Sequence, residues 1–313
     1  MMGLFRKLSD RGMLGMNRRN ISYIGRYNER SKYPLVDDKR LTKQIAVEAN
    51  LNVPNLLAVV DEQSKVRSIH QMVQGHEGFV IKPAKGSGGK GILVILRRDG
   101  DNYVKSNGDV VSRSDVERHL SNTLSGLFSL GGTPDVAVVE ALIDFDPAFA
   151  DYSFEGVPDI RIIIFQGFPV MAMMRLATRA SDGKANLHQG AVGVGLDIAQ
   201  GKTLRAVQYN QPVKHHPDTG AELAQLNVPH WRTMLDLAAG CYDITGLGYM
   251  GADIVLDQKK GPMLLELNAR PGLSIQIANG EGLLPRLRHI EQSNLDFATV
   301  KERVDYAVEN FTN

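Results

Sequence analysis

Residues 251–272 read GADIVLDQKKGPMLLELNARPG, and this stretch decides the fold. Two short apolar runs flank the polar turn DQKKG, which is typical of a β-hairpin. Side chains alternate between the two faces of a strand, so Glu266 and Asn268 face the same way, and Asp253 lies within cross-strand reach of them. A single acid in a strand is usually an ordinary solvent-facing residue. Three oxygen ligands on one hairpin instead predict a Mg²⁺ site beside nucleotide phosphates.

A glycine-rich loop, Gly86-Ser-Gly-Gly-Lys-Gly91, lies between two β-rich runs. It satisfies the G-x-G-x-x-G pattern, but a dinucleotide fingerprint needs a helix after the loop, and here a strand follows. The Walker A pattern fails because Gly91 stands where Ser or Thr is required. A strand–loop–strand lid over phosphates, as in protein kinases, fits this context, although the kinase sequences H-R-D and D-F-G are absent. Lys82, Lys85 and Lys90 favour a phosphate site over a plain tight turn.

The rest of the chain alternates short strands with helices. We expect helices at 36–50, 231–244 and near 296–311, and one more that begins with a capping box formed by Ser114 and Glu117. We expect strands at 79–81, 92–96, 136–142, 160–165, 170–176, 252–256 and 263–267. Because the strands cluster as hairpins with helices between them, we expect an α+β fold with mainly antiparallel sheets.

The composition is that of an ordinary globular protein. The 313 residues are 43% hydrophobic and 23% charged, which argues against disorder and coiled coil. The single cysteine, Cys241, excludes an intramolecular disulfide and a cysteine-based metal cluster, so a reducing compartment is expected. No apolar run approaches the roughly 20 residues that span a bilayer, and the first residues lack the apolar core of a secretory signal. We therefore expect a cytoplasmic protein without membrane insertion.

The net charge of +1 hides an asymmetry. Residues 1–34 contain eight Lys and Arg and two acids, a local charge of +6. Such an arm can bind nucleic acid, but no nucleic-acid fold signature accompanies it. We expect no nucleic-acid partner and favour an arm that packs on the acidic body of its own or a neighbouring chain.

Taken together, these motifs resemble the ATP-grasp superfamily. The resemblance rests on Lys82 before the glycine loop, Val138-Val-Glu-Ala-Leu-Ile143, Asp253 and the motif from Glu266 to Gly272. More narrowly, Asp159-Ile-Arg161 followed by Asn186-Leu-His-Gln-Gly190 resembles the RimK-type α-L-glutamate ligases.

The resemblance implies an ATP-grasp fold, in which two α+β subdomains clamp ATP between antiparallel sheets, with a reduced N-terminal domain. The implied segments are a basic arm at 1–35, an ATP-grasp core at 36–290 with a lid at about 78–142 and a metal-binding subdomain at 143–290, and a C-terminal helix at 291–313. The implied reaction joins a small-molecule or peptide carboxylate to an amine through an acyl phosphate, with ATP and Mg²⁺ or Mn²⁺. Self-association is implied as well.

The family's site roles fall on matching positions of this sequence. The resemblance implies ATP binding by Lys39, Lys82, Lys85, Gly86, Ser87, Gly88, Gly89, Glu140, Ala141, Leu142, Asp159 and Asn186, and metal binding by Asp253, Glu266 and Asn268. Lys184 is implied to lie near the phosphates and is a catalytic candidate. Arg161, Arg175 and Arg270 are the other catalytic candidates, because a guanidinium matches a phosphoryl or carboxylate group bidentately.

Two departures from the family pattern leave the substrates open. Ala185 and Gln189 replace Ser and Arg of the RimK-type run, and Lys184 replaces Arg, so glutamate does not follow as the added amino acid. Only a basic arm of about 35 residues precedes the implied core, so the acceptor does not follow either. A kinase-like phosphotransferase and a non-catalytic ATP-binding module are the alternatives. The complete set of three metal-ligand residues argues against the second of these.

Overall fold

The computed structural model describes residues 10–86, 88–293 and 299–312. The chain divides into two compact units: unit 1 contains residues 1–36, 45–52 and 145–313, and unit 2 contains residues 37–44 and 53–144. Each unit is built on one sheet, and every strand pair in the described part of the chain is antiparallel. The predicted α+β fold with antiparallel sheets is confirmed.

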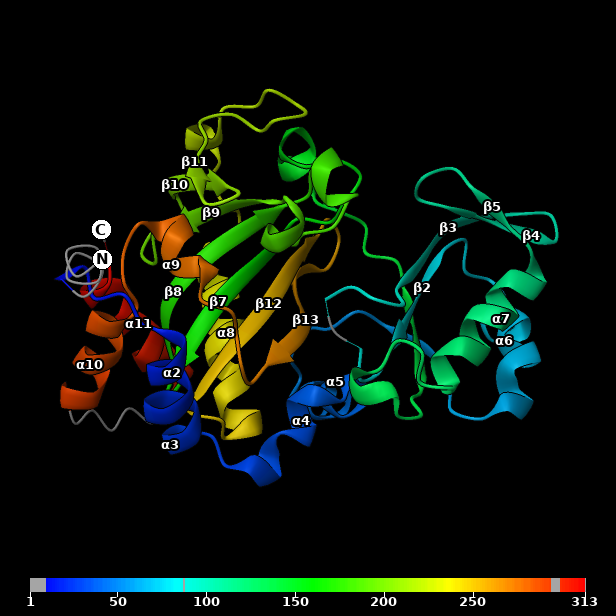
Figure 1. Ribbon diagram of the computed structural model, residues 1–313, viewed down its shortest axis with the longest axis horizontal. Coiled ribbons are helices and arrows are strands. Elements are labelled where there is room, and N and C mark those ends of the chain that lie inside the picture. Colours follow the sequence, from blue (N-terminus) through cyan, green and yellow to red (C-terminus); the bar gives the residue numbers. More distant parts are fainter. Residues whose placement is uncertain (1–9, 87, 294–298, 313) are drawn as a thin grey trace. The chain divides into compact units, whose positions relative to one another are not determined.

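Unit 2 has a six-stranded sheet with three helical segments packed on it (Figure 1). The strand order is β1 (Leu56–Val60), β6 (Ala137–Ala141), β2 (Phe79–Pro83), β3 (Leu93–Asp99), β4 (Asn102–Lys105) and β5 (Val110–Val111). The helical segments are η3 (Gln63–Ser68), α6 (Ile69–Met72) and α7 (Arg113–Leu124), and a short turn of helix, η4, covers Leu130–Gly132.

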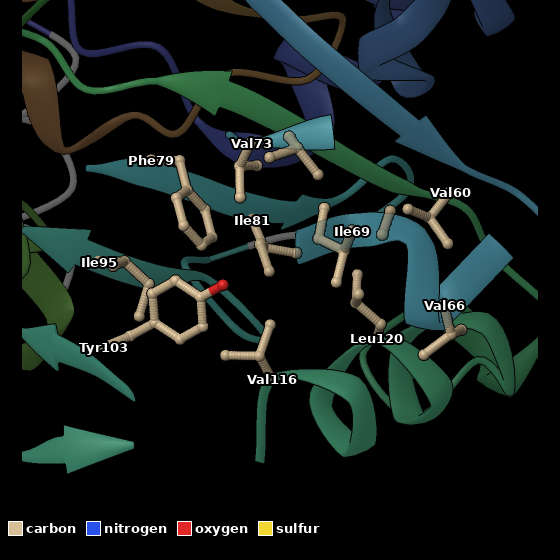
Figure 2. Packing of buried hydrophobic residues seen from close by; sticks show 12 residues of the cluster. Val60, Val66, Ile69, Val73, Phe79, Ile81, Ile95, Tyr103, Val116 and Leu120 are labelled. Atoms are coloured by element: carbon tan, nitrogen blue, oxygen red, sulfur yellow. The ribbon is translucent and has the colours of Figure 1, made fainter. Parts of the chain in front are cut away.

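The core of unit 2 follows from the two-residue repeat of a strand and the roughly four-residue spacing of one helical turn. Phe79 and Ile81 are two residues apart on β2 and point to the same face, and Val116 and Leu120 are one turn apart on α7. All four side chains are buried in one cluster, which Figure 2 shows between the sheet and the helix. This core fixes the strand that carries Lys82.

The helix α7 begins two residues before its predicted start. Its capping box is formed by Ser112 and Asp115, so the predicted box at Ser114 and Glu117 is wrong. Glu117 instead places Oε1 3.1 Å from Nε2 of His70. Capping needs an extended residue just before the helix, and Ser112 has that conformation.

Unit 1 has a seven-stranded sheet. The strand order is β11 (Gln211–Pro212), β10 (Thr203–Gln208), β9 (Val192–Leu196), β8 (Phe168–Leu176), β7 (Asp159–Phe165), β12 (Tyr249–Asp257) and β13 (Gly261–Asn268). The predicted hairpins of β7 with β8 and of β12 with β13 are confirmed. The turn between β7 and β8 has positive φ at Gln166 and Gly167, and glycine adopts that conformation without strain.

Helices α8, α9 and α11 pack against strands of this sheet (Figure 1), and further helical segments complete the unit. They are α8 (Trp231–Thr245), α9 (Ser274–Asn279), α10 (Leu284–Ser293) and α11 (Val300–Asn310), with short helical turns η5 (Pro147–Tyr152), η6 (Arg179–Ser181), η7 (Leu187–Gln189) and η8 (Leu223–Gln225). The helix expected near 296–311 corresponds to α11, and positions 296–298 lie outside the described residues. No helix among the described residues is both long and apolar enough to cross a membrane.

The basic arm is helical where the structure describes it. It contains α2 (Met16–Arg18), η1 (Arg19–Ile24), α3 (Gly25–Tyr27), η2 (Arg30–Lys32) and α4 (Pro34–Asp37), and is followed by α5 (Lys39–Glu48). Tyr23 and Tyr27 pack edge-on against Phe165 of β7, with ring centroids 5.6 and 4.9 Å apart. The described part of the arm therefore packs on its own chain, one of the two arrangements expected, through aromatic contacts.

Candidate active site

Strand register gathers the predicted polar residues of unit 1 on one sheet face. Asp159 pairs with Arg175 between β7 and β8, and Arg161 pairs with Asp253 between β7 and β12. Asp253 in turn pairs with Glu266 on β13, one alternation away from the pair of Gly251 with Asn268. Directly opposed residues of antiparallel strands point to the same face. Six predicted site residues from four adjacent strands therefore share one face.

Two arginines and two aspartates of this face form a buried ion-pair cluster. Arg161 donates Nε and NH2 to the two carboxylate oxygens of Asp253, at 2.7 and 2.5 Å. Arg175 donates its Nε–H to Asp159 at 2.5 Å. Its Nη2 donates to Oδ2 of Asp159 and, at 2.7 Å, to Oδ2 of Asp253. Each aspartate engages the Nε–NH2 edge of a guanidinium, and the NH1 groups lie outside these pairs. The cluster fixes both arginines in planar, bidentate geometry.

The protonation of this cluster depends on its burial. Asp253 is 1% exposed. Burial alone raises the pKa of its carboxyl, but Arg161 and Arg175 outweigh burial and hold that pKa well below its usual range. Burial, reinforced by the charge of Asp253, raises the pKa of Asp159, which Arg175 offsets only in part. We conclude that Asp253 is the anchoring charge and that Asp159 is the more easily protonated partner.

The predicted metal ligands do not all fit a cation equally well. Among the described residues, no three His, Cys, Asp or Glu side chains form a metal-binding group. Both oxygens of Asp253 accept hydrogen bonds from arginines, whose positive charges oppose a cation there. Glu266 and Asn268 are half-buried, share one face and supply hard oxygen donors. Mg²⁺ is commonly held by one or two such ligands together with substrate phosphates, so this pair fits the ion.

The remaining predicted residues of unit 1 make contacts of their own. Lys184 and Asn186 are in the loop between β8 and β9, where Lys184 pairs with Asp182 at 3.1 Å and Asn186 accepts from the backbone N–H of His188 at 3.0 Å. No hydrogen bond or ion pair between described residues joins either of them to the aspartates and arginines of the cluster. Arg270 follows β13, is exposed, and lies over the ring of Tyr33 with Cζ 4.9 Å from the centroid.

In unit 2, two buried lysines share one carboxylate. Lys82 Nζ lies 2.7 Å from Oε2 of Glu140, and Lys43 Nζ lies 2.6 Å from Oε1. Burial raises the pKa of the Glu140 carboxyl, but Lys82 and Lys43 outweigh burial and lower it below its ordinary value. Burial lowers the pKa of Lys43, and Glu140 opposes that shift. The Lys82 ammonium group is thus held at a fixed point of β2 by Glu140.

The glycine loop is braced by neighbouring segments of unit 2. Lys39 Nζ donates to the carbonyl of Gly86 at 2.9 Å, and the Lys85 N–H donates to Asp135 at 3.0 Å. His119 Nε2 lies 3.0 Å from the carbonyl of Gly91, and burial lowers the pKa of this imidazole. The loop is therefore attached at both ends.

Three glycines of the loop, Gly88, Gly89 and Gly91, have positive φ. A Cβ at Gly91 would lie 2.4 Å from the ring of Phe128. Gly88 and Gly89 are exposed, and Ser87 lies outside the described residues. Glycine is therefore required at Gly91 for both conformation and space.

The predicted adenine hinge follows Glu140 at the end of β6. Ala141 already donates its backbone N–H to the carbonyl of Asn55 at 2.9 Å. Leu142 is half-buried, and its side chain would collide with any Cβ at Gly78. The adenine role of these residues stays a prediction.

Sequence reasoning missed two residues of the candidate site in unit 2. Lys43 lies one helical turn after Lys39 on α5, and that spacing was a usable signal. Asp135 accepts from the backbone N–H groups of Lys85 and Val136, and nothing in the local sequence indicates this contact across 50 residues.

Comparison with known proteins identifies the fold family. The model of the sugar-transfer associated ATP-grasp family matches residues 18–292. The chain belongs to this family. The ATP-grasp prediction is therefore confirmed, while the narrower resemblance to RimK-type glutamate ligases stays a prediction. A search of curated proteins finds no match.

Solved structures of ATP-grasp enzymes are similar to this one. D-alanyl-alanine synthetase A from Vibrio cholerae superimposes with a TM-score of 0.50 at 11% identity, over 91% of this chain and 67% of that one. D-cycloserine synthetase DcsG gives a TM-score of 0.47 at 15% identity, over 82% and 70% of the two chains. ATP-grasp ligase PsnB with its minimal precursor gives 0.43 at 14% identity, and this chain spans only 63% of the PsnB length.

Proposed function

We propose that this protein is an ATP- and Mg²⁺-dependent ligase that joins a carboxylate to an amine through an acyl phosphate. Membership of the ATP-grasp family supports nucleotide use. The observation that carries the proposal is the shared sheet face of unit 1, where Arg161 and Arg175 are locked by aspartates beside Glu266 and Asn268. This face offers two oriented guanidinium groups and, from Glu266 and Asn268, hard oxygen donors.

These residue types suit phosphoryl transfer to a carboxylate. A carboxylate oxygen attacks the γ-phosphorus of ATP, the bond to the β-γ bridging oxygen breaks, and ADP leaves. The amine nitrogen then attacks the acyl carbon, the bond between that carbon and the phosphate oxygen breaks, and phosphate leaves as the amine loses a proton to solvent. Both steps depend on orientation and charge neutralisation, which preorganised guanidinium groups provide.

We assign Arg161 and Arg175 to the transferred phosphoryl group and the carboxylate of the acceptor, toward which they would offer the Nη1 groups that lie outside the aspartate pairs. Arg270 is the third candidate for this task. The proposal also includes the roles that the resemblance implies for Lys184 and Asn186, near the phosphates and metal, and for Asp159, near the ribose or the substrate entrance. Asp253 acts through the arginines that it holds, although the resemblance implies a metal role for it.

Glu266 and Asn268 would hold the Mg²⁺ ion, which neutralises phosphate charge when it is bound. Unit 2 supplies Lys39, Lys82, Lys85 and the glycine loop from Gly86 to Gly91 as phosphate ligands, since cations beside exposed backbone N–H groups favour anions. The resemblance implies that this loop closes over the phosphates, and an acyl phosphate needs such protection from water to avoid hydrolysis.

The proposal leaves two substrates to be named. PsnB has been solved with a precursor peptide, and D-cycloserine synthetase is named for a small molecule, so both classes of acceptor belong in a screen. Glutamate belongs among the amines because of the RimK-type resemblance of residues 159–161 and 186–190. We place the reaction in the cytoplasm, because the sequence has one cysteine, Cys241, and therefore no intramolecular disulfide that would call for an oxidising compartment.

The test is ATP turnover with Mg²⁺ across a panel of carboxylates and amines, comparing the wild type with Glu266→Ala. Glu309→Ala is the matched control, because Glu309 is an exposed carboxylate of the same unit on α11. We expect ADP and phosphate only when a carboxylate and an amine are both present, and loss of turnover in Glu266→Ala alone. Turnover on an acceptor without a carboxylate would contradict the proposal and favour a phosphotransferase.

A further inference from the structure

The segment that follows the proposed metal strand is held by the basic arm rather than by the sheet. The last backbone pair of β13 is that of Asn268 with Gly251, so sheet pairing ends at Asn268. The next three residues turn away, and Asn268 Oδ1 accepts from the backbone N–H of Arg270 at 2.8 Å. We call residues 268–271 the Asn268–Pro271 turn.

Three residues of the arm contact three successive residues of this turn. Asn28 donates Nδ2 to the carbonyl of Ala269 at 3.3 Å, the ring of Tyr33 lies under Arg270, and Arg19 donates NH1 to the carbonyl of Pro271 at 2.8 Å. More than 230 residues of sequence separate the members of each pair. The contacts are therefore a product of the fold and not of local chain geometry.

Asn28 ties the arm itself to the sheet. Its side-chain amide donates to the carbonyl of Tyr249 at 2.7 Å and accepts from the N–H of Tyr249 at 2.8 Å, so it pairs with the start of β12 as a further strand residue would. Asn28 is buried, and the bond to Ala269 runs from the same amide group. A rigid link thus connects the strand of Asp253, the arm and the turn.

Tyr33 is placed to direct Arg270. A guanidinium over an aromatic face is attracted by the ring quadrupole, and the contact restricts a long, flexible side chain. Arg270 is exposed, and its contact with the Tyr33 ring is one of the interactions that limit the rotamers of its guanidinium.

We propose that Arg19, Asn28 and Tyr33 are positioning residues of the active site, and that Tyr33 sets the direction in which Arg270 meets the phosphoryl group or acceptor carboxylate. This inference rests on the proposed function for the role of Arg270. The basic arm would thus contribute to catalysis by holding the turn, because Arg19 donates a hydrogen bond to the backbone carbonyl of Pro271.

The first experiment compares Tyr33→Leu with Tyr33→Phe in steady-state kinetics. Leucine removes the ring, whereas phenylalanine keeps the face that Arg270 covers. We expect kcat to fall about tenfold in Tyr33→Leu with KM for ATP unchanged, and to return to within about twofold of the wild type in Tyr33→Phe. Equal kcat values in both variants and the wild type would overturn the role of Tyr33.

The second experiment does not depend on activity. Hydrogen exchange of peptides that span residues 266–274 is compared between the variants Arg19→Gln and Arg18→Gln. Arg18 is exposed and Arg19 is half-buried, and of these two neighbouring arginines only Arg19 contacts the turn in the described structure. We expect at least about threefold faster exchange of the turn in Arg19→Gln alone. Equal exchange would overturn the positioning role.

The two experiments separate the inference from the proposed function. A wild type without turnover on any carboxylate–amine pair would refute the proposed function. Hydrogen exchange would still decide whether the arm positions the turn.

Discussion

Glu140→Gln tests whether one buried carboxylate holds the two lysines of unit 2 in place. Glu140 Oε1 and Oε2 lie 2.6 and 2.7 Å from Lys43 and Lys82. At an effective dielectric constant of about 20, each pair is worth roughly 6 kcal/mol of Coulomb energy, most of which offsets desolvation. Removing the shared charge leaves two buried cations uncompensated, so we expect a loss of about 3–5 kcal/mol in the unfolding free energy of unit 2.

The assay is a urea titration followed by hydrogen exchange of peptides from β2 and β6. With a denaturant slope near 2 kcal/mol per molar, the expected loss lowers the midpoint of unit 2 by about 1.5–2.5 M. Trp231, the single tryptophan, lies on α8 in unit 1, so its fluorescence is an internal control that should not shift.

The matched control is Asp61→Asn. Asp61 pairs with Lys65 at the same 2.7 Å, also within unit 2, but both side chains are about 40% exposed, so water screens the pair. We expect a midpoint within error of the wild type. If Glu140→Gln shifts the midpoint no more than Asp61→Asn does, burial does not make the Glu140 pairs important, and the reasoning is refuted.

Three further predictions concern Glu140, Gly91 and the pair of Asp253 and Glu266. The pKa of Glu140 in the folded protein lies below its ordinary value of 4.5. The stabilisation from its ionised carboxylate is therefore complete above pH 4.5 and disappears as the pH falls through the folded pKa. The urea midpoints of the wild type and Glu140→Gln should accordingly converge in acid. Gly91→Ala should lower stability and activity more than Gly108→Ala, since both have positive φ but only Gly91 lacks space for a Cβ, and equal midpoints would contradict this. Asp253→Asn should lower kcat about 10²-fold without changing the Mg²⁺ requirement, whereas Glu266→Gln should raise the Mg²⁺ concentration for half-maximal rate; a raised requirement in Asp253→Asn would restore its metal role.

Short-range patterns predicted the strands of the site well. The apolar runs 252–256 and 263–267 on either side of the polar turn predicted the hairpin, and the register confirms that Asp253 opposes Glu266 and that Asn268 shares their face. The helix starting near Ser114 was misplaced by two residues, because two serines compete for the cap and only Ser112 has the extended conformation.

Contacts between distant segments were beyond the reach of the sequence. Asp253 meets Arg161 because β12 pairs with β7, and that pairing joins strands 92 residues apart. No local periodicity specifies this neighbour, so the sequence showed an acid suited to a metal and not an acid already held by arginines. The contact of Tyr33 with Arg270 was hidden for the same reason.

The most direct test of the central claim follows oxygen atoms. The carboxylate that supports turnover in the panel is labelled with oxygen-18, and the released phosphate is analysed by mass spectrometry. An acyl phosphate forms by attack of the carboxylate and is cleaved at the acyl carbon, so the account predicts one oxygen-18 atom in each phosphate released with amide product. Unlabelled phosphate formed together with amide product would contradict the account.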